Sequence, residues 1–199
     1  MAEILENCCG SKEKLIKATF ELIASKGFES TGINEILKNA GVTKSNFYYH
    51  FKSKEELCLT VLNYMENYFF ENMVNPSLLN LTLPPKDRLK KYLDSTVERM
   101  KSSCCNCGCP FVNLGNETSD FYPAFREKIS QVNTRHLQAI ERCIHDGIKS
   151  GDFRQDLDPG AIAKFILAEV NGSVVLAKIF KTIDVLNENN KSLLKMLFS

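Results

Sequence analysis

Residues 102–110, SSCCNCGCP, contain four of the chain's eight cysteines within six positions: Cys104, Cys105, Cys107 and Cys109. Thiolates bind soft metals, and a thiolate of lowered pKa reacts with oxidants and electrophiles. The spacing is C-C-x-C-x-C, not the paired C-x2-C of a zinc ribbon or knuckle. Gly108 and Pro110 predict the end of a helix here, so neither a helix nor a regular turn would bring all four sulfurs together.

Three interpretations of these cysteines remain open. They pack incidentally at a helix end, they form a thiol switch for oxidants or electrophiles, or they bind a metal. A metal site could recruit ligands from other helices, such as Cys58 or Cys143. A switch needs a thiol of lowered pKa, to which Arg99 and Lys101 just upstream could contribute. We expect no resident metal and no other cofactor.

Length and composition restrict the class of protein. The 199 residues suffice for one large domain or two small ones, and 44% apolar with 25% charged residues is typical of a globular protein. The N-terminus lacks the order of a signal peptide, and no apolar run reaches the roughly 18 residues of a membrane helix. We therefore expect a cytoplasmic protein without a membrane contact. In the cytoplasm, cysteines rarely form structural disulfides.

The sequence does not support an enzyme. Its three histidines, His50, His136 and His145, are scattered along the chain. There is no glycine-rich phosphate loop and no nucleophile motif. We predict a protein without catalytic residues.

Helical periodicity runs through the chain, and strand-like alternation is not sustained anywhere. Ser11, Thr43 and Ser53 stand where helix N-caps are expected, and Pro159 suits the first turn of a helix. The segment NPSLLNLTLPPKD, with its three prolines, is the clearest break between helices. The sequence therefore predicts an all-α fold.

Three short helices in the first 52 residues match the helix-turn-helix plan, with NAGVT joining the second to the third. Gly41 permits a sharp turn at this joint, and Phe47 and Phe51 are expected in the core. Residues 11–54 contain eight lysines and four glutamates, an excess of four positive charges in a chain whose net charge is +1. Such a concentration of positive charge is typical of a surface that contacts DNA phosphates.

The run STGINEILKNAGVTKSNFYYHFKSKEEL resembles the TetR family of bacterial transcriptional regulators. The resemblance covers about residues 11–58 in its spacing, glycines, aromatics and closing lysine, and is weak beyond them. Gly32 departs from the family, which often has a threonine or serine there, while Thr31 remains available for a phosphate contact. The resemblance implies a DNA-binding domain over residues 11–58, with the helix-turn-helix at about 33–52, and a helical effector-binding and dimerisation domain over 59–199.

The short third helix would place its N-terminal residues deepest in the major groove of double-stranded DNA. Lys44 suits guanine and Asn46 suits adenine, because their side chains match the hydrogen-bonding groups of those bases. The other DNA contacts that we expect are Thr31, Thr43, Ser45, Tyr48, Tyr49, His50 and Lys54. Lys54 resembles the phosphate-binding lysine of the family, and phosphate contacts position a protein without selecting sequence.

A homodimer on a near-palindromic operator is expected, because helix-turn-helix proteins pair on two half-sites. The stretch GAIAKFILAEVNGSVVLAKIF and the final NNKSLLKMLF resemble the two helices that build the family's dimer bundle. Val174 and Leu176 are predicted to face the partner, although burial in the chain's own core is the alternative for these helices.

A ligand-responsive repressor, released from its operator by a small-molecule effector, is the function that these features favour. Aromatic and polar side chains are predicted to form the effector pocket: Tyr64, Tyr68, Phe111, Asn113, Glu117, Phe125, Phe165 and Asn171. The alternative is a thiol- or metal-responsive repressor. The stretch GCPFVNLGNE resembles a run in a TetR branch that includes thiol-based sensors of electrophiles, in which Cys109 matches the recurrent cysteine.

Overall fold

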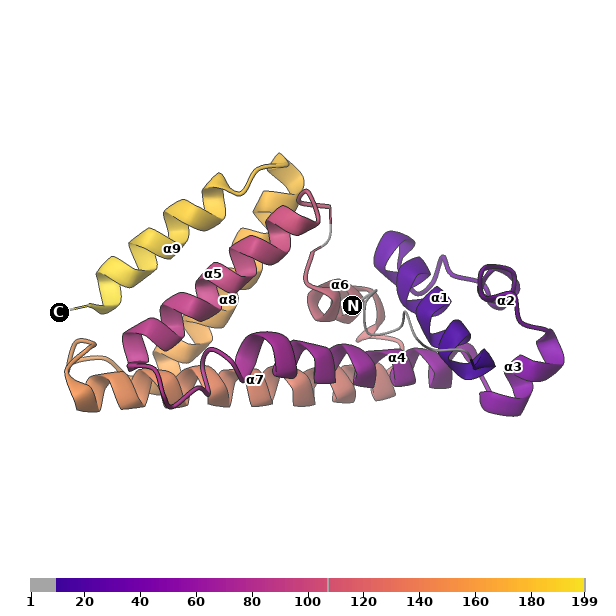
Figure 1. The fold of residues 1–199 in the computed structure, drawn as a ribbon, viewed down its shortest axis with the longest axis horizontal. Helices are drawn as coiled ribbons and strands as arrows, with labels where there is room; N and C mark the ends of the chain where they lie inside the picture. The colour runs from indigo at the N-terminus through magenta and orange to yellow at the C-terminus, as the bar shows by residue number, and fades with distance from the viewer. Residues whose placement is uncertain (1–9, 107, 199) are drawn as a thin grey trace. The chain divides into compact units, whose positions relative to one another are not determined.

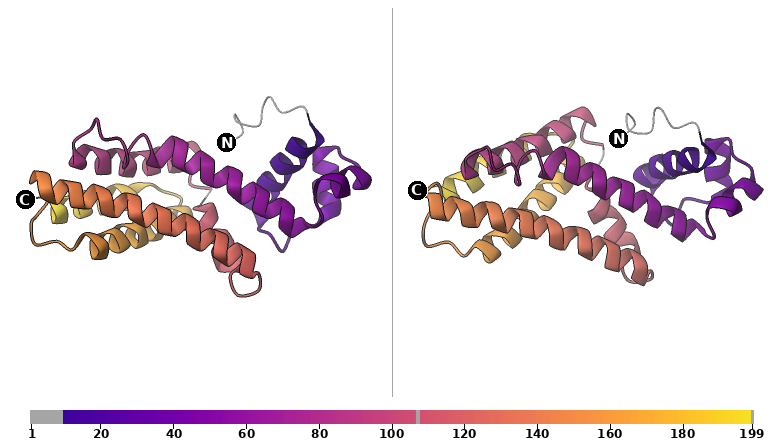
Figure 2. Two further views of the ribbon diagram at one scale, coloured as in Figure 1. Left: turned by 90° about the horizontal axis from the view of Figure 1, so that it is seen from below. Right: turned by 60° about the horizontal axis from the view of Figure 1, so that its bottom comes forward.

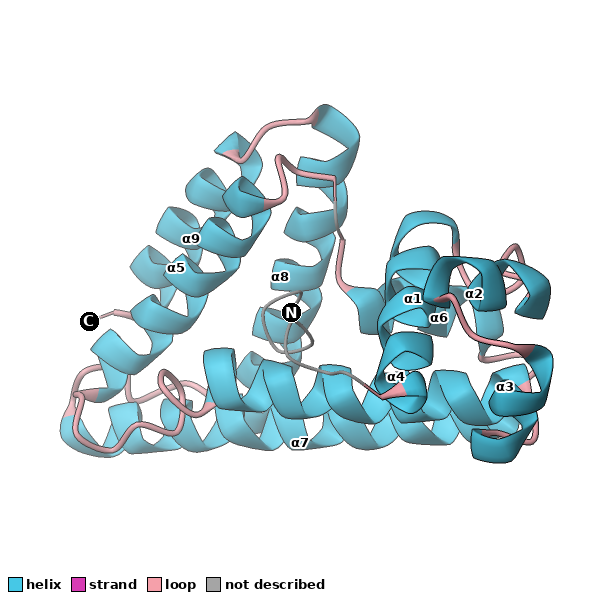
Figure 3. Cartoon of the chain, turned by 45° about the vertical axis from the view of Figure 1, so that its right-hand side comes forward, coloured by secondary structure: helices cyan, strands magenta, loops and turns pink. Residues whose placement is uncertain are grey.

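The computed structural model describes residues 10–106 and 108–198, and within them it contains helices and loops without a strand (Figure 3). The all-α prediction is confirmed. Cys107 lies outside the described residues, so its predicted place in the cysteine cluster has no structural description. The chain forms two compact units, one made of Met1–Tyr68 with Asn113–Ser130 and the other of Phe69–Val112 with Gln131–Ser199.

The first unit contains α1 (Ser11–Lys26), α2 (Ile33–Ala40), α3 (Lys44–His50) and most of α4 (Lys54–Phe69) (Figure 1). Its core is built by apolar side chains from all four helices, including Leu15, Ile36, Phe47 and Leu57. Gly41 ends α2 in the left-handed conformation with φ 63°, which a residue with a side chain rarely adopts. The predicted helix-turn-helix therefore forms, with the turn at the predicted glycine.

Two of the predicted N-caps form. Thr43 Oγ1 accepts a hydrogen bond from the Asn46 N–H at 3.3 Å, and Ser53 Oγ accepts one from the Glu56 N–H at 3.1 Å. The prediction for Ser11 was wrong by one position, because α1 already begins at Ser11 and Gly10 is its N-cap. The Ser11 hydroxyl is instead bonded to side chains of α3.

The second unit contains the π-helical turn η2 (Phe70–Val74), α5 (Pro85–Ser102), α8 (Pro159–Phe180) and α9 (Asp184–Leu197). Helices α6 (Pro110–Thr118) and α7 (Pro123–Ser150) each contribute residues to both units, and α7 is the long continuous helix in both views of Figure 2. Pro159 occupies the first turn of α8, as predicted, and the Asp158 carboxylate caps this helix by accepting from the Ala161 N–H at 2.7 Å.

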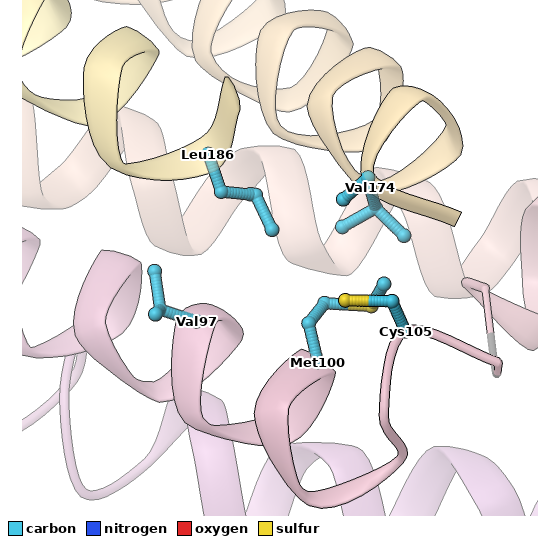
Figure 4. Close-up of a cluster of buried hydrophobic side chains, with 6 residues drawn as sticks. Val97, Met100, Cys105, Val174 and Leu186 are labelled. Atoms are coloured by element: carbon cyan, nitrogen blue, oxygen red, sulfur yellow. The ribbon is translucent and has the colours of Figure 1, made fainter. Parts of the chain in front are cut away.

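Helices α5, α8 and α9 pack around a buried cluster (Figure 4) made of Val97, Met100, Cys105, Val174, Ala177 and Leu186. Val174 is 1% exposed within its own chain. Its predicted place on a dimer surface is therefore wrong, and the alternative of core packing holds for this residue.

Helix α8 is more apolar than expected. By length and composition alone its 22 residues suffice to cross a membrane, although no such run was predicted. Charged residues such as Lys164 and Glu169 interrupt the apolar run without making the helix polar. Only 33% of its most apolar window is buried in the chain, so α8 keeps a wide apolar surface that nothing in the described residues covers.

Candidate DNA-reading helix and effector cavity

The N-terminal end of α3 presents polar side chains to solvent. Lys44, Ser45 and Asn46 are exposed, while Phe47 behind them is fully buried and anchors the helix to the core. Tyr48 is 50% and Tyr49 83% exposed, which is unusual for large aromatic side chains and leaves both free to meet another molecule.

The start of α1 contacts the same face of α3. The Ser11 hydroxyl lies 2.7 Å from His50 Nε2 and donates to Asn46 Oδ1 at 3.3 Å. Asn46 and His50 are one helical turn apart, so a single hydroxyl orients two predicted DNA contacts. This role of Ser11 could not be predicted, because hydrogen bonds over 35 and 39 positions leave no local signal in the sequence.

Two predicted phosphate contacts are engaged inside the unit. Thr31 is fully buried, and its hydroxyl donates to the Gly27 carbonyl at 2.7 Å. The half-buried Lys54 donates from Nζ to the carbonyls of Phe28 at 2.9 Å and Thr31 at 3.1 Å. The arrangement does not favour Thr31 as a phosphate contact, whereas the Lys54 ammonium has a third N–H to offer.

A small cavity lies within the second unit, among α5, α7 and α8 and next to the start of α6. Its apolar lining includes Phe69, Met73, Phe111, Val132, Val170 and Val174, and its polar lining includes Tyr92, Thr96, Arg99, Cys109, Asn133, His136 and Asn171. The cavity volume is about 30 Å³, which corresponds to about two water molecules. An apolar cavity with a few convergent polar groups is typical of a ligand site.

His136 is the polar residue most enclosed by aromatic rings in this cavity. It is 6% exposed, and its ring packs edge-on against Phe69 at 4.9 Å and Tyr92 at 5.4 Å between ring centroids. Burial lowers the pKa of His136 to about 4, so the imidazole is neutral at physiological pH. Its Nε2 has no hydrogen-bond partner among the described residues, which leaves it available to a bound molecule.

Two other polar groups of the cavity are constrained. Burial raises the pKa of the Tyr92 phenol, with a further contribution from Cys109, so this group stays a neutral hydrogen-bond donor. Arg99 donates from a guanidinium nitrogen to the Gly108 carbonyl at 3.3 Å. This bond ties the cationic side chain to the loop that carries Cys109.

Only two residues of the predicted pocket, Phe111 and Asn171, line the cavity. Tyr64, Asn113 and Phe165 are exposed and Tyr68 is half-buried outside the lining. Phe125 is buried against Phe28 in the first unit, and Glu117 binds backbone N–H groups there. These six lie outside the cavity lining, because composition identifies aromatic and polar residues but not which face of a helix is turned inward.

The cysteines that the structure describes do not converge. Cys104 is exposed and Cys105 belongs to the buried cluster, and both have left-handed backbones, with φ 48° and 56°, where α5 ends. Cys109 lines the cavity. In the described part of the chain no three Cys, His, Asp or Glu side chains form a possible metal site.

Cys58 and Cys143 were considered as further metal ligands, and both are buried away from this loop. Burial raises the pKa of Cys58 to about 12 and that of Cys143 to about 11, so both stay protonated thiols. The Cys143 thiol donates to the Pro85 carbonyl at 3.4 Å. Neither residue supports the metal interpretation.

Two family descriptions match the chain: bacterial regulatory proteins of the tetR family over residues 15–61, and the tetracyclin repressor-like C-terminal domain over residues 85–193. The chain belongs to the TetR family of transcriptional regulators. As a member of this family it is a DNA-binding regulator with an operator-reading domain and a dimerisation domain, and it is not an enzyme.

Similar proteins agree with this assignment. An HTH-type transcriptional regulator in the lacX 3′ region of Lactococcus lactis subsp. lactis is 32% identical over 96% of this chain and 95% of its own length. The HTH-type transcriptional repressor DhaR from Mycobacterium sp. strain GP1 is 25% identical over 89% of this chain and 87% of its own. A crystal structure of a regulatory TetR protein from Rhodobacter sphaeroides superposes with a TM-score of 0.85 at 26% identity, covering 94% of this chain and 98% of that one.

Proposed function

We propose that this TetR regulator is a cytoplasmic repressor that binds a near-palindromic operator as a homodimer and is released by a small molecule. The observation that carries the proposal is the solvent-exposed N-terminal end of α3, with Lys44 and Asn46 in positions to reach base edges. The name of DhaR, a repressor, supports the sign of regulation. Division into domains at residues 11–58 and 59–199 remains our prediction.

The apolar surface of α8 and α9 supports the dimer. Large apolar side chains are exposed there: Phe165, Val175, Leu176, Ile179, Phe180 and Met196. A soluble protein rarely leaves so many neighbouring apolar side chains in water, and a second copy would bury them in a symmetric contact. Burial against a second copy would also account for the apolar surface of α8 without a membrane.

The cavity of the second unit is the proposed effector site. Its volume of about 30 Å³ is far below the roughly 300–1,000 Å³ of an open ligand pocket. An effector would therefore have to displace side chains or α6, and this displacement would couple binding to a change of conformation.

A thiol-responsive repressor is the second candidate, and Cys109 is the observation that favours it. This half-buried thiol lines the cavity with Tyr92 and Arg99, so a molecule that enters would meet the sulfur. Cys104 and Cys105 have no such position. Incidental packing remains the third interpretation for those two, and the arrangement of the described cysteines gives no support to a metal sensor.

Selection of genomic fragments by the purified protein tests the proposed function. Recovery of one inverted-repeat sequence, bound by two protomers, is the expected result. Failure to enrich any sequence at low salt would reject operator binding. Neighbouring genes of the recovered fragment then supply candidate effectors for release assays.

A further inference from the structure

The turn between α1 and α2 is held by one carboxylate of α6. Glu117 Oε2 accepts a hydrogen bond from the Phe28 N–H at 2.9 Å, and Oε1 accepts one from the Glu29 N–H at 2.8 Å. Hydrogen bonds to an ionised group are roughly twice as strong as neutral ones. Glu117 is thus a member of the first unit and does not line the cavity.

The turn is shaped to receive this carboxylate. Gly27 ends α1 with φ +88°, and a Cβ added there would lie 2.7 Å from both Glu117 oxygens. Any side chain at position 27 would therefore displace the carboxylate. Glycine here leaves the space that the carboxylate fills.

Other elements hold the same turn as well. Helix α4 binds its carbonyl groups, and Tyr122 together with the first turn of α7 packs against its Phe28 side chain. Lys54 Nζ donates to the carbonyls of Phe28 and Thr31. The Phe28 ring packs edge-on against Tyr122 at 5.1 Å and Phe125 at 4.9 Å. A turn held at its N–H, carbonyl and side-chain groups follows any displacement of the helices that hold it.

Helix α6 also carries Phe111, which lines the cavity, and it begins directly after Cys109. Glu117 lies six positions after Phe111, which is about 9 Å along a helix axis. Because α6 runs without a break from Pro110 to Thr118, we expect a displacement of its first turn to reach Glu117 in its last turns through the hydrogen-bonded backbone.

We propose that Glu117 is the positioning residue that couples α6 to the operator-reading helices, so that the state of the cavity and operator affinity depend on each other. This inference rests on the proposed function, because it needs an operator and an effector-responsive cavity. Linkage requires the dependence to be reciprocal. Operator binding must therefore alter access to the cavity, which can be measured without knowing the effector.

The probe is iodoacetamide, and the reporter is Cys109 in a full-length chain with Cys104 and Cys107 changed to serine. Mass spectrometry follows the rate of alkylation with and without saturating operator duplex. We expect operator to slow alkylation about fivefold or more in this background, because it favours the state with the closed cavity. Glu117→Gln, which loses one of its two acceptor oxygens, should bring the two rates within twofold of each other. The exposed Asp120→Asn removes the same charge and should retain the slowing.

Gly27→Ala provides an independent second variant, since it displaces the carboxylate from the other side. Loss of the operator effect in Glu117→Gln and Gly27→Ala, with helicity retained, supports the proposal. Equal slowing in the background chain and in a folded Glu117→Gln or Gly27→Ala protein overturns it, and so does operator binding without slowing in the background chain. Absence of operator binding in the wild-type protein would instead reject the proposed function.

Discussion

The ammonium of Lys54 lies 3.9 Å from the centroid of the Phe28 ring while it donates to the Phe28 carbonyl at 2.9 Å. One side chain thereby contacts both the ring and the backbone of the turn that precedes α2. Lys54 was predicted as a phosphate contact, and the structure gives it a structural role as well. A single substitution should therefore affect stability and DNA binding together.

Lys54→Ala should lower the free energy of unfolding by about 1–3 kcal/mol, because two carbonyls lose a charged donor, and it should weaken binding to all DNA sequences alike. Urea titration and fluorescence anisotropy measure the two effects. The exposed Lys52→Ala removes the same charge and should leave stability unchanged. Equal stability of both variants would show that the Lys54 contacts contribute nothing to folding.

Lys44→Ala and Asn46→Ala should relax base preference as well as lower affinity. Each lost base contact is worth about 1–3 kcal/mol, whereas alanine at the exposed Lys91 on α5 should change neither property. Binding to operator variants with single base changes gives the measurement. Unchanged affinity and preference in both variants would mean that α3 does not read the bases.

His136 should make stability fall with acid. Its folded-state pKa of about 4 lies below the 6.5 of an ordinary histidine, so the unfolded chain binds the proton first as pH falls. Stability is therefore full above about pH 6.5 and decreases toward pH 4, by up to about 3 kcal/mol. Urea titrations of wild type and His136→Leu across this range check it. The stability of the wild type relative to His136→Leu should fall as the pH is lowered toward 4. A constant difference in stability across this range would refute the assignment. The exposed His145→Leu serves as the control.

The helix-turn-helix could be predicted from the sequence, because the residues that signal it lie close to the contacts they make. Gly41 ends one helix and Thr43 caps the next, and both lie within a few residues of the contacts they make. The cavity could not be predicted in this way. His136 is one of three histidines in the sequence, and only the packing of Phe69 and Tyr92 around it distinguishes it. Glu117 binds a turn that lies 89 positions away, which no periodicity reveals.

The dimer surface is best tested at Ile179, which is 64% exposed, and not at Val174, which is buried in the chain's own core. Ile179→Asp should give folded monomers with weakened operator binding, because a charge in an apolar interface is costly. Sedimentation and circular dichroism measure assembly and folding, with the exposed Thr134→Asp on α7 as control. A stable Ile179→Asp dimer would place the interface elsewhere.

The thiol hypothesis makes its own prediction, centred on Cys109. If this residue is the switch, mild peroxide or a quinone should weaken operator binding, because a modified sulfur in a cavity of about 30 Å³ must displace its neighbours. Thiol reductant should restore binding after peroxide. Cys109→Ser should abolish the response, whereas Cys104→Ser, at an exposed position outside the cavity lining, should retain it. The measurement is operator affinity by fluorescence anisotropy in the wild type and both variants. It is taken before treatment, after treatment and after reduction. Equal affinity throughout in the wild-type protein would leave these cysteines without a sensing role and a reversibly bound effector as the trigger.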